Sequence, residues 1–186
     1  MNVIETKLQG VFIIEPKIFG DSRGWFLESW SAARMSEAGF DYKFVQDNHS
    51  FSACKGVLRG IHFQLGNAAQ AKLVRCVAGA VMDVVVDLRK GSPTYKEWVS
   101  IELSADNYRQ LLIPRGFGHA FLTLTDNVEF LYKADNSYNA KADRSIRWND
   151  PQLAIEWGIT APIVSEKDSI APLLCESDCD FVWGEI

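Results

Sequence analysis

A series of short β-strand patterns between residues 57 and 135 constrains the fold more than any other feature of the sequence. Lys72–Ala78 and Val81–Leu88 are rich in β-branched residues, and Gly79-Ala80 between them fits a hairpin turn. Further strand patterns are found at 97–104, 109–113, 119–125 and 128–135. Many short strands joined by tight turns are typical of a β-sandwich or β-barrel, so a mostly β fold is expected.

Outside these strands the sequence predicts few regular elements. Ser31 can cap a helix over Ala32–Ala38, and Gly39 can end it. From about Pro151 the apolar residues are scattered, so we expect a tail of short elements that wraps the barrel. The remaining expectations are strands at 11–14, 25–30, 44–50 and 145–148, and a Gly-containing loop at 19–24. With 186 residues and no repeat or linker, the chain is expected to form one domain, residues 1–186.

Charge and cysteine content narrow the functional class. The net charge of −5 argues against nonspecific binding of nucleic acid. No stretch approaches the roughly 20 apolar residues of a membrane span, and no signal segment begins the chain, so we expect a cytoplasmic protein without membrane contact. Cys54, Cys76, Cys175 and Cys179 are expected to be reduced and structural, because such a compartment is reducing.

The stretch from Gly56 to Gly79 resembles the first motif of the cupin barrels. Gly56 precedes His62 by the spacing that this motif requires. Gln64 then stands where cupins have a second His, and Lys72 stands where they have Glu. The resemblance implies a cupin, or jelly-roll, β-barrel with a few short helices, whose usual metal ligands have been replaced.

Pro114–His119 resembles the second cupin motif. A cupin metal site needs about three imidazoles and a carboxylate, whereas the charged Lys72 has no lone pair to donate. The sequence contains only His49, His62 and His119, and at most two of them fall in these motifs. We therefore expect no metal. Two imidazoles and an ammonium at the mouth of a barrel suit proton removal beside a carbonyl, with the ammonium stabilising the enolate oxygen.

Strand periodicity predicts which side chains share the barrel interior. Alternation places His62, Lys72, His119 and Tyr132 each on a face with apolar residues, as expected for a polar mouth above an apolar floor. Any one of these residues, taken alone, is more often an ordinary interior or strand-end side chain. Their common position on cupin ligand sites favours the functional interpretation for His62, Lys72 and His119.

Three other charged residues are assigned by the same alternation. Arg59 has the wrong parity to lie beside His62, unless a bulge or twist at Gly60 brings it to the rim. Asp83 and Asp87 share one face of a Val-rich strand and are expected to point outward into solvent.

Several separated segments together resemble the dTDP-4-dehydrorhamnose 3,5-epimerase family. They are Leu58–Gln64, Ala71–Arg75, Ile113–Phe121, Glu129–Lys133 and Ile146–Pro151. The family inverts C3 and C5 of dTDP-4-dehydro-6-deoxy-glucose through enolates, in the route to dTDP-L-rhamnose. By this resemblance His62 is the base, Tyr132 the opposed acid, Lys72 the group that holds the C4 oxygen and Asp168 the carboxylate that orients the base.

The same resemblance implies a substrate-binding set, no cofactor and a homodimer. The dimer would exchange N-terminal strands, so Phe19 and Arg23 would serve the neighbouring site. The implied substrate contacts are Phe19, Arg23, Glu28, Gln46, Asp47, Asn48, Arg59, His119, Tyr138, Asp143 and Lys167.

Two departures from the family and three alternatives stay open at this point. Asp143 stands where the family often has Glu, which puts that contact in doubt, and the loop at Gly66–Ala69 lacks the prolines often found there. A related dTDP-sugar epimerase that inverts only C3 or only C5 would have nearly the same residues. The further alternatives are a metal-dependent cupin such as a dioxygenase, and a sugar-nucleotide-binding barrel without catalysis.

Overall fold

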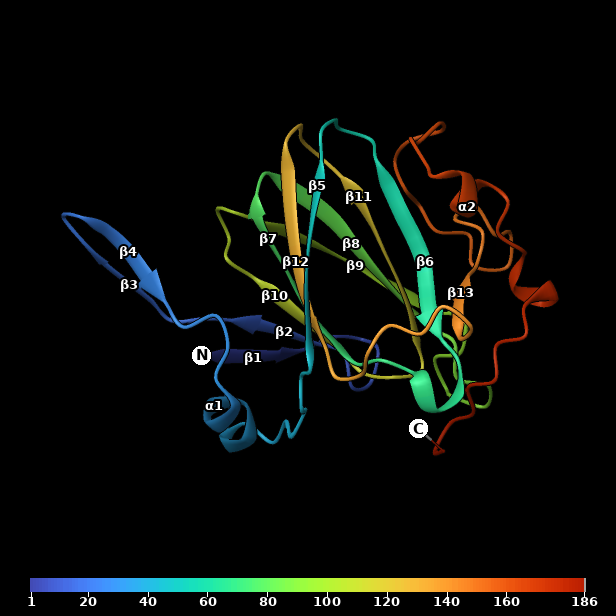
Figure 1. Cartoon of the computed structure of the whole chain (residues 1–186), viewed down its shortest axis with the longest axis horizontal. Coiled ribbons are helices and arrows are strands. Elements are labelled where there is room, and N and C mark those ends of the chain that lie inside the picture. The colour runs from blue at the N-terminus through green and yellow to red at the C-terminus, as the bar shows by residue number, and fades with distance from the viewer. Residues whose placement is uncertain (186) are drawn as a thin grey trace.

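The computed structural model describes residues 1–185 as two antiparallel sheets that face each other (Figure 1). The six-stranded sheet has the order β1 (Asn2–Glu5), β2 (Phe12–Glu15), β10 (Gln110–Ile113), β7 (Lys72–Ala78), β12 (Val128–Ala134) and β5 (Gln46–Ser52). The five-stranded sheet has the order β13 (Asp143–Ser145), β6 (Leu58–Gln64), β11 (Phe117–Thr123), β8 (Ala80–Asp87) and β9 (Trp98–Ser104). The predicted mostly β fold is therefore confirmed.

The helices are short and lie outside the sheets. Helix α1 spans Ala32–Glu37, and the Ser31 hydroxyl accepts a hydrogen bond from the backbone N–H of Arg34, as its capping role predicts. Helix α2 spans Glu166–Ser169, and single 3₁₀ turns occupy Gly66–Ala68 and Leu174–Glu176. Among residues 1–185 no helix has the length and apolarity to cross a membrane.

The space between the two sheets is filled by apolar side chains from both inner faces. Val74 and Cys76 of β7 and Phe130 of β12 meet Val85 of β8 and Phe121 of β11 in one buried cluster. Alternation places four of these residues, Val74, Cys76, Phe130 and Phe121, on the same faces as Lys72, Tyr132 and His119. The apolar floor predicted from strand parity is confirmed.

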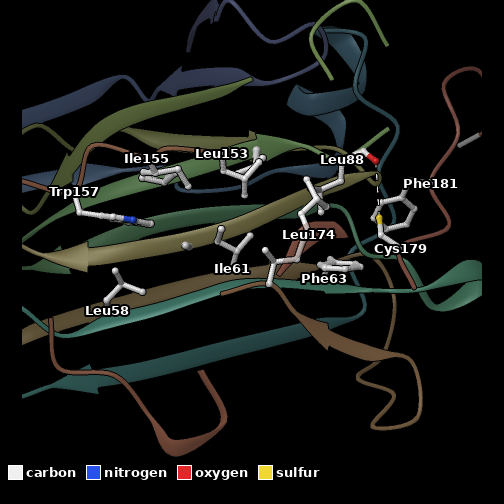
Figure 2. Close-up of a cluster of buried hydrophobic side chains, with 14 of the residues drawn as sticks. Leu58, Ile61, Phe63, Leu88, Leu153, Ile155, Trp157, Leu174, Cys179 and Phe181 are labelled. Carbon is white, nitrogen blue, oxygen red and sulfur yellow. Dashed lines mark hydrogen bonds between the residues drawn. The ribbon is translucent and has the colours of Figure 1, made fainter. Parts of the chain in front are cut away.

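A second cluster joins the C-terminal segment to the outer face of the five-stranded sheet. Figure 2 shows Ile61 and Phe63 of β6 packed with side chains from the tail, including Trp157, Leu174 and Phe181. These tail residues are each at most 7% exposed. Burial of large aromatic and aliphatic side chains stabilises this attachment, and it leaves the sheet no solvated outer face here.

Strand β8 corrects the placement of Asp83 and Asp87. Both carboxylates are fully buried, not solvated as expected from the sequence. Because β8 lies between β11 and β9 and is covered on one face by the core and on the other by the tail, neither of its faces meets water. Asp87 is compensated by hydrogen bonds from Arg89, Ser92 and Thr94.

The segment at 19–24 is a hairpin and not the expected loop. Strands β3 (Ile18–Asp21) and β4 (Gly24–Leu27) pair with each other only, and the hairpin projects away from both sheets (Figure 1, left). The Asp21 carboxylate accepts a hydrogen bond from the backbone N–H of Arg23, which shapes the turn. Trp25 and Phe26 are 58% and 67% exposed on this arm.

Candidate active site

A cavity of about 500 Å³ opens at one end of the barrel, between the two sheets and the C-terminal segment. Residues from β6, β7, β11 and β12 form its walls, and residues 163–168 form one side of its mouth. Its charged and titratable side chains are Arg59, His62, Lys72, His119, Tyr132, Lys167 and Asp168.

His62 is oriented by Asp168. The imidazole Nε2 lies 2.6 Å from Oδ1 of Asp168, whose side chain is 3% exposed. Burial alone would raise the pKa of Asp168, but its hydrogen bonds with His62 and Ser165 and the contact with the Gly60 N–H hold the pKa below its ordinary value. An ionised carboxylate accepts the Nε2 proton, so a neutral His62 has its lone pair on Nδ1. Nδ1 has no hydrogen-bond partner within residues 1–185 and is free to act as a base.

Lys72 and Tyr132 lie on the wall opposite His62, since they belong to the six-stranded sheet and His62 to the five-stranded sheet. The Lys72 Nζ is 5.9 Å from the centroid of the Tyr132 ring. Burial lowers the pKa of Lys72 to about 8, against the opposing charges of Asp143 and Asp83. Burial raises the pKa of Tyr132, so the phenol keeps its proton at neutral pH and can donate it.

Arg59 reaches this cavity because the strand register shifts beside it. His62 of β6 pairs with His119 of β11, but Arg59 pairs with Phe121, so one extra residue of β6 is accommodated near Gly60. This irregularity places Arg59 and His62 on the same face, which is the bulge that strand parity required. The Arg59 guanidinium donates to the carbonyl of Phe51 at the rim, which holds the cation beside the opening.

Five residues of the expected binding set are connected at the rim. The Tyr138 backbone N–H donates to the Gln46 side chain at 2.8 Å, and the Tyr138 hydroxyl donates to Asp143 at 3.2 Å. Lys167 also donates to Asp143, so the shorter arm of Asp143 still reaches two expected neighbours. The Gln46 amide donates to Asn48, whose strand position faces Tyr132. The Tyr138 ring is 60% exposed, as a surface for a stacking ligand would be.

Four other residues of that set lie away from the cavity of this chain. Asp47 has the opposite parity to Gln46 and Asn48, and its carboxylate pairs with Lys133 on the outer face of the sheet. Glu28, Phe19 and Arg23 belong to the projecting arm or its base: Phe19 and Glu28 line a separate hollow, and Arg23 pairs with Asp21 at the tip.

Asp83 is the charged neighbour of the site that strand periodicity missed. Both of its carboxylate oxygens lie within hydrogen-bond distance of His119 Nε2, at 2.9 and 3.1 Å. A signal was present in the sequence, because Val84 and Val86 alternate with Val81 and Val85, which predicts a strand that is apolar on both faces. A carboxylate in such a strand has to find a buried partner.

Comparison with known proteins identifies the family. The family model described as dTDP-4-dehydrorhamnose 3,5-epimerase matches residues 5–176. This chain belongs to the dTDP-4-dehydrorhamnose 3,5-epimerase family. The enzyme of that name from Shigella flexneri is 54% identical over 169 residues, covering 90% of this chain and 93% of its own length.

Two solved structures of the epimerase family agree closely with the fold. The dTDP-4-dehydrorhamnose 3,5-epimerase of Bacillus anthracis, solved with TDP and pyrophosphate bound, has a TM-score of 0.90 and 49% identity, over 92% of this chain and 98% of that one. The epimerase of Legionella pneumophila, in complex with dTDP-4-keto-L-rhamnose, has a TM-score of 0.91 and 47% identity, over 95% and 94%. The predicted family, its cupin-like fold and its epimerase class are confirmed.

Proposed function

We propose that this chain inverts C3 and C5 of dTDP-4-dehydro-6-deoxy-glucose, giving dTDP-4-dehydro-rhamnose, with His62 as the base and Tyr132 as the acid. The observation that carries the proposal is the hydrogen bond between His62 and the buried Asp168, on the wall opposite a protonated Tyr132. An inversion beside a ketone needs a base on one face of the sugar and an acid on the other. The two facing sheets supply these groups from opposite sides.

In each inversion, His62 Nδ1 takes the proton from the carbon next to the C4 ketone. The electron pair of that C–H bond moves to the carbonyl and forms an enolate, whose oxygen is stabilised by the Lys72 ammonium. Tyr132 then delivers a proton to the same carbon from the opposite face, and solvent restores the protonation of both groups. Because C3 and C5 both neighbour C4, the same groups serve both inversions.

The diphosphate of the substrate requires cations near the mouth of the cavity. Arg59 and Lys167 are positioned to bind it, and a guanidinium can donate two parallel hydrogen bonds to a phosphate. His119 lies deeper, as a further phosphate or sugar contact. The exposed Tyr138 ring is the proposed stacking surface for thymine.

We also propose a homodimer in which the β3–β4 arm enters the partner's site. The arm exposes Phe19, Trp25 and Phe26 to solvent and its strands pair with neither sheet, so a second copy of the chain is a natural partner. Phe19, Arg23 and Glu28 would then complete the neighbour's cavity, which explains why they lie away from their own. The proposed location is the cytoplasm, in line with four unpaired cysteines, two of them exposed.

Incubation with dTDP-4-dehydro-6-deoxy-glucose in heavy water tests the reaction. We expect deuterium at both C3 and C5 and a product with both centres inverted, as read by NMR. Deuterium at only one of the two carbons would assign the chain to the single-inversion epimerases. His62→Ala should abolish the exchange and keep binding of dTDP, and unchanged exchange in that variant would refute the base assignment.

A further inference from the structure

The buried Asp83 is a carboxylate beside the site that the proposed reaction does not use. It lies on β8 with 0% exposure, and its only hydrogen bonds within residues 1–185 are those to His119 Nε2. His119 lines the cavity from β11, and Asp83 contacts it from the neighbouring strand β8 without lining the cavity itself. An ionised carboxylate in an apolar core is costly unless a cation compensates it.

On the facing sheet, Lys72 is a cation without a directly bonded counter-charge within the described residues. Its ammonium forms no hydrogen bond or salt bridge within the described part of the chain, although its neighbours on the same face, Val74 and Cys76, are buried. The inner faces of β7 and β8 meet in one core, which brings Lys72 and Asp83 into the same enclosed region with His119 beside them. Asp143 also acts on Lys72, but it lies at the rim and is shared by Lys167 and Tyr138.

We propose that Asp83 is a positioning residue that keeps Lys72 protonated: it is the buried counter-charge of the ammonium and fixes the imidazole of His119 between them. The reasoning is electrostatic. An enclosed ammonium tends to lose its proton, and without that proton it can no longer stabilise an enolate oxygen. A negative charge that water cannot screen acts over a longer range than one at the surface. Burial raises the pKa of Asp83 itself, and the charges of His119 and Lys72 oppose that rise.

Apart from Asp168, the other charged and titratable groups around Lys72 differ from Asp83 in exposure or charge. They are Cys76 on β7, Arg59 and His62 on β6, His119 on β11, Tyr132 on β12, Asp143 on β13, and Lys167 and Asp168 on α2. Asp168 is hydrogen-bonded to His62 on the five-stranded sheet and is not one of the charges that act on Lys72, whereas Asp83 is.

A direct titration of Lys72 tests this inference, which rests on the proposed role of Lys72 but is measured without substrate. Lysine labelled with ¹³C and ¹⁵N is followed by NMR, and the Lys72 signal is assigned with Lys72→Met. In Asp83→Asn the Asn oxygen can still accept from His119, and only the charge is lost. We expect Lys72 to titrate about one pH unit lower than in the wild type. Equal titration in both proteins would overturn the proposal.

Two further measurements separate charge from structure. Glu129→Gln removes a carboxylate from the outer face of the same barrel and should leave the Lys72 titration unchanged. Coupling between two charges is reciprocal, so Lys72→Met must raise the pH at which the Asp83 carboxyl carbon titrates. This second measurement decides the question even if Asp83→Asn does not fold, and an unmoved Asp83 titration would refute the pairing.

Enzyme kinetics provides an independent readout of the same coupling. In Asp83→Asn the alkaline limb of the kcat–pH profile should move to lower pH, because Lys72 loses its proton earlier. A purely structural role would lower kcat by the same factor at every pH. If Lys72 couples to Asp83 but the wild type does not epimerise the sugar, the proposed reaction fails and the electrostatic pairing stands.

Discussion

Replacing Asp168 by Asn should nearly abolish catalysis while leaving the cavity intact. Asp168 is 2% exposed, and Asn has the same shape and fills the same space. The backbone N–H of Gly60 points at Oδ2 of Asp168, at 3.5 Å, so the amide oxygen of Asn is favoured there and its NH₂ group then faces His62. Nε2 would have to accept this hydrogen bond, which moves the ring proton to Nδ1 and removes the lone pair that takes the substrate proton.

The expected magnitude follows from the loss of the correct tautomer. In serine proteases the equivalent change of the orienting Asp to Asn lowers kcat by roughly 10⁴-fold, which corresponds to about 5.5 kcal/mol in the barrier. We expect a loss of similar size, roughly 10³- to 10⁴-fold, because Asp168 is the only side-chain partner of His62 within the described chain and its carboxylate is buried.

The assay is kcat for epimerisation, together with the rate of deuterium entry into the sugar. Binding of dTDP should change little, and the matched control Glu166→Gln, on the exposed side of the same short helix, should behave as the wild type. An Asp168→Asn enzyme that keeps more than a tenth of wild-type kcat would refute the reasoning from tautomers.

Three more predictions test other parts of the site. Lys72→Met should lower kcat by about 10²- to 10³-fold, or about 2.7–4 kcal/mol in the barrier, while the affinity for dTDP is kept. In the wild type, kcat should fall as the pH rises through the Lys72 pKa of about 8. A flat kcat profile from pH 7 to 9 would contradict this. Gly60→Ala should destabilise the fold by about 3 kcal/mol or more in urea unfolding, since Gly60 has φ +125° and a Cβ there would lie 2.5 Å from the Ala120 Cβ; wild-type stability would show that the bulge tolerates a side chain. Arg23→Ala should be nearly inactive. When it is refolded with an equal amount of His62→Ala, half of the dimers are mixed and each mixed dimer has one intact site, so exchanged arms should restore about a quarter of wild-type activity. No recovery of activity would place Arg23 outside the partner's site.

Strand parity predicted the floor of the barrel and most of the cavity wall. Lys72, His119 and Tyr132 lie inside because each alternates with residues that the core requires to be buried. Alternation fails where a strand is irregular. The position of Arg59 depends on a register shift, and Gly60 was the only sign of that shift in the sequence. Asp83 was misplaced because it shares the inner face of β8 with Val81 and Val85, and alternation alone does not reveal which face points inward when both faces are apolar.

The N-terminal arm and the rim were harder to predict for a different reason. Gly20 and Gly24 indicated a loop. The segment is instead a hairpin, whose turn is stabilised by the hydrogen bond from the Arg23 N–H to the Asp21 carboxylate. Contacts such as that between Tyr138 and Asp143 depend on loops whose paths short-range patterns do not specify.

The attachment of the C-terminal tail links late folding to the onset of activity. Asp168 belongs to that tail, and the tail is held by Trp157, Leu174 and Phe181 against the outside of β6. The strands precede Asp168 in the order of synthesis, so they can pair before that residue leaves the ribosome. At that stage His62 is in place without its orienting carboxylate. On the proposed mechanism, the chain becomes active only when the segment that carries Asp168 has docked, and a proteolytic cut that releases this segment should abolish activity while the sheets stay intact.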